Sequence, residues 1–197
     1  ILGRVVCEAL LMEGVLPVIK HIPGHGRANV DSHKALPTIP TEYTELSKTD
    51  FLPFKILADM PIAMTAHIIY SAIDRENPAT TSPKVISEII RKIIGFDGML
   101  ISDDLSMQAL DGMFADRTQA ALAAGCDAVL HCNGDMSEMR EIADTVSYFS
   151  DKSVEELNLI IKSDVHGSSE AIKNAISQIK HDEVKPKIIL ADIGMVT

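Results

Sequence analysis

The densest group of reactive side chains lies between Lys20 and His33, in the segment Lys-His-Ile-Pro-Gly-His-Gly-Arg-Ala-Asn-Val-Asp-Ser-His. It contains three histidines, one aspartate and two cations. Its glycines permit tight turns and a close approach of the backbone to a ligand. Asp31 lies two residues before His33, so a loop can bring the carboxylate to the imidazole and orient it for acid–base catalysis.

Two other interpretations of this segment stay open from the residues alone. His21 and His25 stand four residues apart and could bind a metal ion, although the Pro-Gly pair between them breaks any helix that would place both rings on one face. The segment could also be a polar surface loop. However, the stretch 22–41 has no helical period, and a long irregular segment after a strand is more often functional than idle.

Two adjacent carboxylates form the second candidate. Asp103 and Asp104 follow the apolar run Met99–Ile101, which predicts that they stand at the carboxyl end of a strand. Carboxylates in this position serve as nucleophile, base or metal ligand in barrel enzymes. The alternative is that one of them caps the N-terminus of a following helix.

Weaker candidates stand at the ends of other predicted strands. His67 could face the same site or cap its own strand, and we expect His131 to be structural. Asp74 and Arg75 fit a loop beside the site and solvated surface charge equally well. The segment 164–167, Asp-Val-His-Gly, could bind an anion at a helix N-terminus, but no glycine-rich phosphate motif surrounds it.

Six short apolar runs predict the strands that position these residues. Their starts lie 47, 36, 29, 29 and 30 residues apart, and a strand–helix–strand unit takes about 30 residues or more. The chain therefore predicts an α/β fold of consecutive βα units with a parallel sheet. The predicted strands are Val15–Lys20, Ile62–Ile68, Met99–Ser102, Ala128–Cys132, Leu157–Lys162 and Lys187–Ala191.

Helical signals fill gaps between those strands. Ser82 can cap a helix that starts with the following proline, and the stripe of apolar residues over Val85–Ile94 has the spacing of one helix face. Gly95 suits the position directly after that helix. Two further helices are expected, one at 118–124 and one over 172–179.

The composition limits the class of protein. Of the 197 residues, 46% are hydrophobic and 23% charged, with a net charge of −10, which fits a globular chain of one domain or one and a half. No apolar run approaches the roughly 18 residues of a membrane span. The acidic balance argues against nucleic-acid binding, so we expect neither a nucleic acid nor a membrane as partner. Three cysteines at uninformative spacing predict free thiols in a reducing, cytoplasmic compartment.

The ends of the chain suggest a fragment or an engineered protein. The chain opens at Ile1 inside an apolar helical pattern and closes on Ile-Gly-Met-Val-Thr directly after an apolar run. A mature protein with trimmed ends is the alternative. A complete (β/α)8 barrel takes about 250 residues, more than this chain has.

Five motifs, in this order and spacing, resemble those of bacterial family 3 glycoside hydrolases. More narrowly, they resemble the cytoplasmic β-N-acetylhexosaminidases of peptidoglycan recycling, and the resemblance covers residues 1–153. The motifs are Lys20–Gly26 followed by Asp31–His33, Met64–His67, Gly95–Gly98 running into Ser102–Met107, and Ala124–Asp127.

The resemblance implies a retaining hydrolase that removes terminal β-linked N-acetylglucosamine from a small sugar or muropeptide, without a cofactor or a metal. Asp103 matches the nucleophile of the family. His33, on a mobile loop and paired with Asp31, matches its general acid–base. The substrate-binding candidates are Lys20, His21 and His67.

The last part of the chain resembles an unrelated family. Residues 154–197 are similar to an internal α/β segment of bacterial translation initiation factor 2, through Glu156–Ser168, 182–185 and 188–189. This single β-α-β unit carries none of the GTP-binding motifs of that factor, so it implies neither catalysis nor a nucleotide. We therefore expect a chimera, in which a foreign unit completes a partial (β/α)8-type barrel.

Three hypotheses about function follow from these resemblances. The first is hexosaminidase activity, weakened because the early strands of the family barrel have no match in residues 1–153. The second is a chimera without catalysis, in which a second copy of the chain covers open sheet edges and apolar helix faces. The third is a translation-related binding module.

Overall fold

The computed structural model describes residues 2–146, 156–163 and 185–193. The chain forms two compact units, Ile1–Val146 and Ser147–Thr197. The predicted helix over 172–179 and the candidate segment 164–167 lie outside the described residues. Among the helices that are described, none has the length and apolar character needed to cross a membrane.

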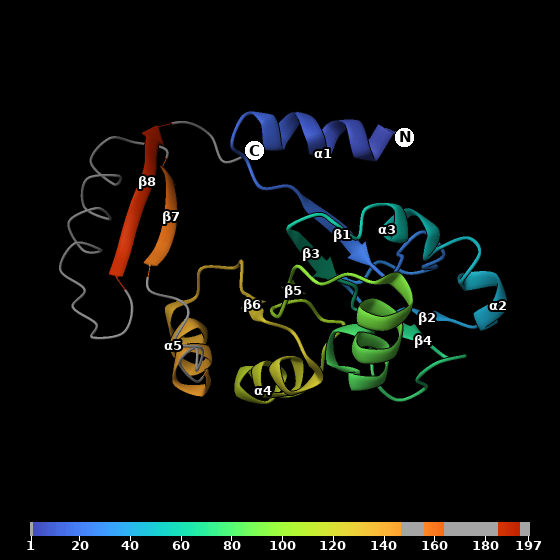
Figure 1. Cartoon of the computed structure of the whole chain (residues 1–197). Helices are drawn as coiled ribbons and strands as arrows, with labels where there is room; N and C mark the ends of the chain where they lie inside the picture. Colours follow the sequence, from blue (N-terminus) through green and yellow to red (C-terminus); the bar gives the residue numbers. More distant parts are fainter. Residues whose placement is uncertain (1, 147–155, 164–184, 194–197) are drawn as a thin grey trace. The chain divides into compact units, whose positions relative to one another are not determined.

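A parallel sheet of four strands organises the first unit (Figure 1). Its strands stand in the order β1 (Val18–Ile22), β3 (Ile62–Thr65), β5 (Met99–Asp104) and β6 (Ala128–Leu130). Each neighbouring pair is parallel. The predicted α/β class with consecutive βα units is therefore confirmed, and the carboxyl ends of all four strands meet at one edge of the sheet.

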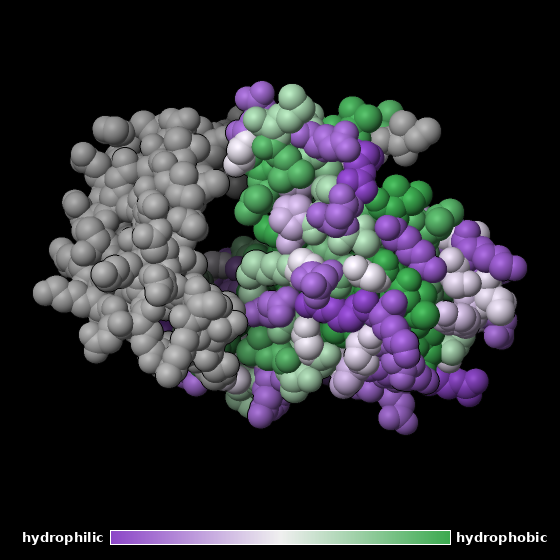
Figure 2. All heavy atoms as spheres, in the orientation of Figure 1, coloured by the Kyte–Doolittle hydropathy of each residue, from purple (hydrophilic) through white to green (hydrophobic). Residues whose placement is uncertain are grey.

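Helices and one small sheet fill the connections. The helix α1 (Leu2–Met12) precedes β1, and Figure 2 shows apolar residues along it; the side chains of Leu2, Val5 and Val6 are exposed. The irregular segment after β1 is largely as predicted, with a two-residue strand near its end. The remaining elements are β2 (Thr38–Ile39) paired with β4 (Ile69–Tyr70), α2 (Tyr43–Leu46), α3 (Leu52–Ile56), η1 (Ala79–Thr81), η2 (Val85–Ile94), α4 (Phe114–Ala124) and α5 (Met136–Thr145).

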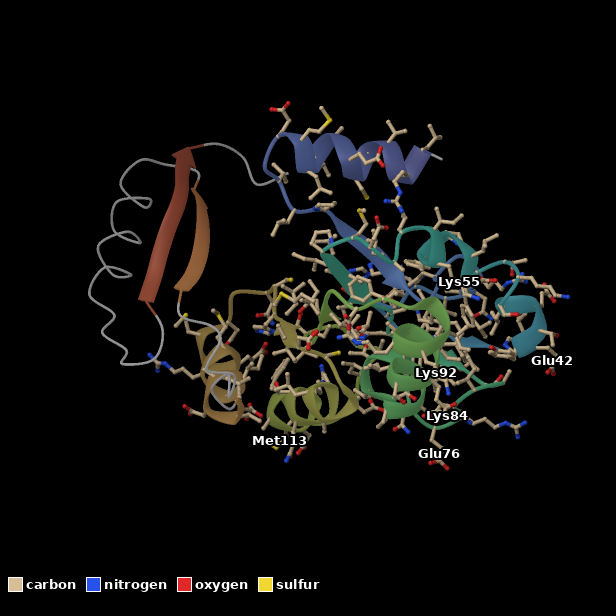
Figure 3. The ribbon with its side chains drawn as sticks, in the orientation of Figure 1. Glu42, Lys55, Glu76, Lys84, Lys92 and Met113 are labelled. Atoms are coloured by element: carbon tan, nitrogen blue, oxygen red, sulfur yellow. The ribbon has the colours of Figure 1, made fainter. Side chains whose placement is uncertain are left out.

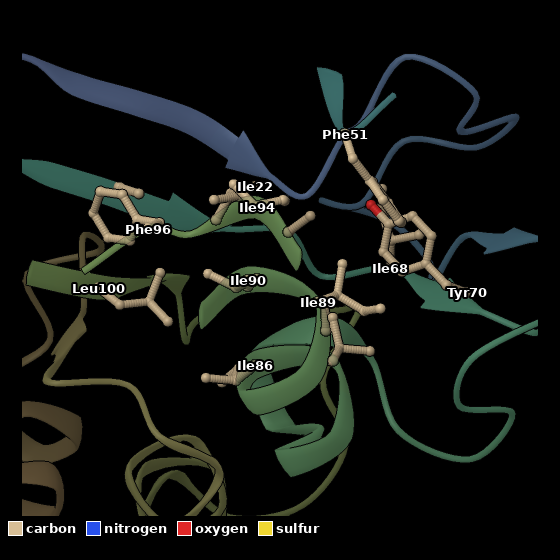
Figure 4. Close-up of a cluster of buried hydrophobic side chains, with 14 of the residues drawn as sticks. Ile22, Phe51, Ile68, Tyr70, Ile86, Ile89, Ile90, Ile94, Phe96 and Leu100 are labelled. Atoms are coloured by element: carbon tan, nitrogen blue, oxygen red, sulfur yellow. The ribbon is translucent and has the colours of Figure 1, made fainter. Parts of the chain in front are cut away.

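The helix η2 packs its buried isoleucines into the same hydrophobic cluster as the buried residues of the sheet. The Oγ atom of Ser82 accepts the N–H of Val85 at 3.1 Å, which confirms the predicted cap. At the other end Gly95 has a φ of 82° and donates its N–H to the carbonyl of Ile90, five residues earlier, so the helix is a π-helix rather than the expected α-helix. Its buried isoleucines join a cluster that includes Phe96 and Leu100 (Figure 4), whereas Lys84 and Lys92 are exposed (Figure 3).

The second unit contains two described strands. They are β7 (Glu156–Ser163) and β8 (Lys185–Ile193), which pair in parallel with each other. The predicted strands at 157–162 and 187–191 are thus confirmed. That this unit adds strands to the sheet of the first unit stays a prediction.

Candidate active site

The strand order brings together two residues that lie far apart in the sequence. Asp103 stands near the carboxyl end of β5, and its side chain is only 13% exposed. Its Oδ1 atom accepts the N–H of Asp104 at 2.9 Å. Its Oδ2 atom lies 3.6 Å from the Nε2 atom of His21, which comes from β1 on the other side of β3. The carboxylate is therefore held at one oxygen and faces an imidazole with the other.

His21 connects the carboxylate to the loop that follows β1. Burial lowers the pKa of His21 and outweighs the carboxylate of Asp103, which raises it. The ring of His21 lies 5.3 Å from the ring of His25, centroid to centroid. The Nε2 atom of His25 in turn lies 3.4 Å from the Oγ atom of Ser32. A line of contacts thus runs from the candidate nucleophile to the middle of the Asp-Ser-His segment.

The structure brings Asp31 and His33 into contact. The Oδ1 atom of Asp31 accepts both the backbone N–H of His33 and a bond from its Nδ1 atom, each at 3.0 Å. The backbone hydrogen bond, together with the side-chain bond, lowers the pKa of Asp31. A carboxylate at Nδ1 requires the proton on that nitrogen, which leaves Nε2 of His33 available to the substrate. Both side chains are exposed, that of His33 by 76%.

The other substrate-binding candidates occupy different environments. Lys20 is exposed on β1, directly before His21. His67 lies two residues beyond the end of β3, which is shorter than predicted, and is fully buried. Its Nδ1 atom lies 2.7 Å from the hydroxyl of Thr80 and its Nε2 atom 3.0 Å from the carbonyl of Asp104. Both ring nitrogens therefore have protein partners, and direct contact of His67 with a sugar stays a prediction.

The alternative that Asp103 or Asp104 caps a helix is wrong, because the next helix along the chain, α4, begins ten residues later at Phe114. The carboxylate of Asp104 instead accepts the N–H and the hydroxyl of Ser106, at 2.9 and 2.6 Å, and the N–H of Cys132 at 3.1 Å. Burial alone would raise the pKa of Asp104, but these hydrogen bonds outweigh it and lower the pKa. No pattern in the sequence indicates the bond to Cys132, which belongs to the segment after β6.

Two weaker candidates, His131 and Asp74, make contacts within the fold. The side chain of His131 is 6% exposed, and its ring packs edge-on against Phe114 at 5.2 Å. Asp74 is not a solvated charge, because its carboxylate accepts the hydroxyl of Ser82 at 2.7 Å and the N–H groups of Glu76 and Asn77. Burial alone would raise the pKa of Asp74, but these hydrogen bonds lower it to about 2.

No group of three potential ligands for a metal occurs within the described ranges. A pocket of about 270 Å³ lies elsewhere in the first unit, where Leu36, Glu76, Leu110 and Arg117 are among its lining residues. Its lining holds none of the residues proposed for catalysis or sugar binding. The candidate site is therefore defined by the contacts around Asp103 and by the Asp31–His33 pair.

Known proteins resemble both parts of the chain. A beta-hexosaminidase from Bordetella pertussis is 40% identical over 141 residues, which are 70% of this chain and 40% of that protein. One from Alkalilimnicola ehrlichii is 46% identical over 61% of this chain and 35% of its own length. The crystal structure of NagZ from Neisseria gonorrhoeae in complex with N-trifluoroacetyl-D-glucosamine is 34% identical, with a TM-score of 0.66, and covers 74% of this chain and 42% of its own.

Two family models match the chain, and their ranges overlap over residues 133–159, so the predicted boundary at 153/154 stays a prediction. The family model of translation-initiation factor 2 matches residues 133–197, so the resemblance of the C-terminal part to that family is confirmed. The chain spans about two fifths of the length of the curated relatives it matches. The model of the glycosyl hydrolase family 3 N-terminal domain matches residues 1–159. Over that range, which is most of its length, the chain belongs to glycosyl hydrolase family 3.

Proposed function

We propose that this chain carries the catalytic residues of a retaining β-N-acetylhexosaminidase, which releases terminal β-linked N-acetylglucosamine from muropeptides in the cytoplasm. The observation that carries the proposal is the pairing of a nearly buried carboxylate, Asp103, with His21 at the carboxyl ends of β5 and β1. Catalytic groups of parallel α/β enzymes gather at this edge. The beta-hexosaminidase relatives and the sugar-bound neighbour support the same substrate class.

Each proposed catalytic group has one role in the first half of the reaction. A carboxylate oxygen of Asp103 attacks the anomeric carbon and forms an ester bond as the glycosidic C–O bond breaks. The leaving oxygen takes the proton from Nε2 of His33, whose Nδ1 side is held by Asp31. The intermediate is a covalent glycosyl-enzyme.

The second half restores the enzyme. Neutral His33 removes a proton from water as the water oxygen attacks the anomeric carbon, and the ester bond to Asp103 breaks to release the carboxylate. His21, kept neutral by its lowered pKa, is suited to hold a sugar hydroxyl beside Asp103 without forming a permanent ion pair with it. Lys20, exposed beside His21, supplies a second donor to the sugar.

Hydrolysis of a chromophore-releasing aryl β-N-acetylglucosaminide tests this function. We expect turnover by the full chain that exceeds that of an Asp103→Ala variant by at least about 100-fold, as for loss of a nucleophile. Equal rates for the two chains would reject the enzyme proposal. Retention of configuration in the released sugar would separate a covalent mechanism from direct attack by water.

A second candidate is a chimera without catalysis, with residues 1–153 forming a partial barrel and 154–197 a foreign β-α-β unit. The match of the C-terminal residues to translation-initiation factor 2 supports it, as does the exposed apolar side of α1. In this case a second copy of the chain would cover the open edges of the four-stranded sheet. Light scattering that finds only monomers would exclude that covering, and salt-sensitive co-sedimentation with ribosomes would instead favour a translation-related module.

A further inference from the structure

Asp104, next to the candidate nucleophile, has all its polar groups engaged within the described residues. Its backbone N–H donates to Oδ1 of Asp103 at 2.9 Å, and its carbonyl lies 3.0 Å from Nε2 of His67. Its carboxylate accepts the N–H and the hydroxyl of Ser106 and the N–H of Cys132. Three segments therefore fix one residue: the turn after β3, the turn after β5 and the segment after β6.

The local strand geometry explains why such fixing is needed. The pairing of β5 with β6 shifts register between Ile101 and Asp104, so the ladder is interrupted around Asp103. It resumes at Asp104, which pairs with Leu130, and the N–H of Leu105 donates to the carbonyl of Leu130 at 2.9 Å. The carboxylate of Asp104 continues the connection by reaching the N–H of Cys132, two residues beyond β6. The buried pair His67–Thr80, joined at 2.7 Å, holds the other side of the same residue.

We propose that Asp104 is a positioning residue that sets the direction of the nucleophilic carboxylate of Asp103. The bond between them starts at a backbone N–H, so its direction depends on how the peptide unit before Asp104 is turned. The hydrogen bonds of the Asp104 carboxylate, and the contact of its carbonyl with His67, hold the residue that carries this N–H. This role rests on the proposed hydrolase function, in which the carboxylate of Asp103 must point at the anomeric carbon.

Kinetics of two substitutions at this position test the role. We expect Asp104→Ala to lower kcat by about 100-fold with KM changed by less than about twofold, since a misplacement of about 1 Å costs a reaction about that much. Asp104→Asn keeps an oxygen that can accept both backbone N–H groups, and should stay within about tenfold of the unaltered chain. Ser106→Ala removes only the hydroxyl donor and is the matched control. Thermal melts confirm that each variant folds.

The amide proton of residue 104 gives a readout that does not depend on turnover. Its NMR chemical shift reports the hydrogen bond to Asp103, and the Asp103→Ala variant defines the position without that acceptor. We expect the shift to move towards this position in Asp104→Ala and to stay near the original one in Asp104→Asn. An unchanged amide shift in Asp104→Ala, or an unchanged kcat, would overturn the positioning role. If the unaltered chain shows no turnover, the hydrolase proposal alone is rejected. The amide shift then tests by itself whether Asp104 sets the direction of the Asp103 carboxylate.

Discussion

The Nε2 atom of His21 lies 3.6 Å from the Oδ2 atom of Asp103, although 82 positions separate the two residues in the sequence. Parallel strands β1 and β5, with β3 between them, create this relationship. It places a partly buried imidazole of lowered pKa beside the candidate nucleophile. Under the proposed function, the pairing supplies both the group that attacks the sugar and a neutral donor that holds it.

Replacement of His21 should therefore weaken substrate use. We expect His21→Leu to lower kcat/KM by about 10-fold to 100-fold, because a hydrogen bond to the sugar beside a charged group is lost. Steady-state kinetics with an aryl β-N-acetylglucosaminide measure this effect. His25→Leu is the control, because the ring of His25 contacts His21, and its effect should be smaller. Full activity of His21→Leu would contradict the role.

The Asp31–His33 pair should affect catalysis but not stability. We expect Asp31→Asn to lower kcat by about 100-fold, because an amide no longer fixes the proton on Nδ1 of His33. The melting temperature should stay unchanged, because both side chains are exposed and exposed ion pairs contribute little to stability. Kinetics and a thermal melt of the same sample separate the two effects. A large drop in melting temperature would show that the pair serves the fold instead.

Asp74 should make the first unit sensitive to acid. Its pKa is lowered from 3.8 to about 2 in the folded chain, so the unfolded chain binds a proton first as the pH falls. The stabilisation is present above pH 3.8 and is lost as the pH falls towards about 2.

Urea unfolding at a series of pH values checks this prediction. The difference in free energy of unfolding between the unaltered chain and Asp74→Asn should shrink through that pH window, because asparagine does not titrate. A difference that stays constant down to pH 2 would mean that the carboxylate of Asp74 does not carry the effect.

Gly98 should be required at the start of β5. A Cβ atom at this position would lie 2.5 Å from the carbonyl oxygen of Pro61 and 2.8 Å from that of Met60, and backbone atoms cannot yield as a flexible side chain can. We expect Gly98→Ala to reduce the free energy of unfolding by about 2 to 4 kcal/mol. Gly26→Ala is the matched control, because no atom lies within 4 Å of its added Cβ, and its effect should be below about 0.5 kcal/mol.

Local patterns in the sequence determined the elements and the groups that can react. The isoleucine stripe of η2, its cap at Ser82 and its end at Gly95 are all readable because a helix is specified by spacing and terminal residues. The spacing of the apolar runs predicted parallel βα units. The Asp-Ser-His segment predicted a contact between Asp31 and His33, since two residues of a loop suffice to make it.

Only the tertiary structure decided which distant residues share the site. The pairing of Asp103 with His21 depends on strand order, which no local pattern contains. Likewise, the position of His67 in the sequence left open whether it faces the site or caps its own strand. In the structure its side chain is buried, in contact with the hydroxyl of Thr80 and the carbonyl of Asp104. Such contacts join segments that meet only after the chain folds, so the sequence determined the reactive groups and the fold determined how they face one another.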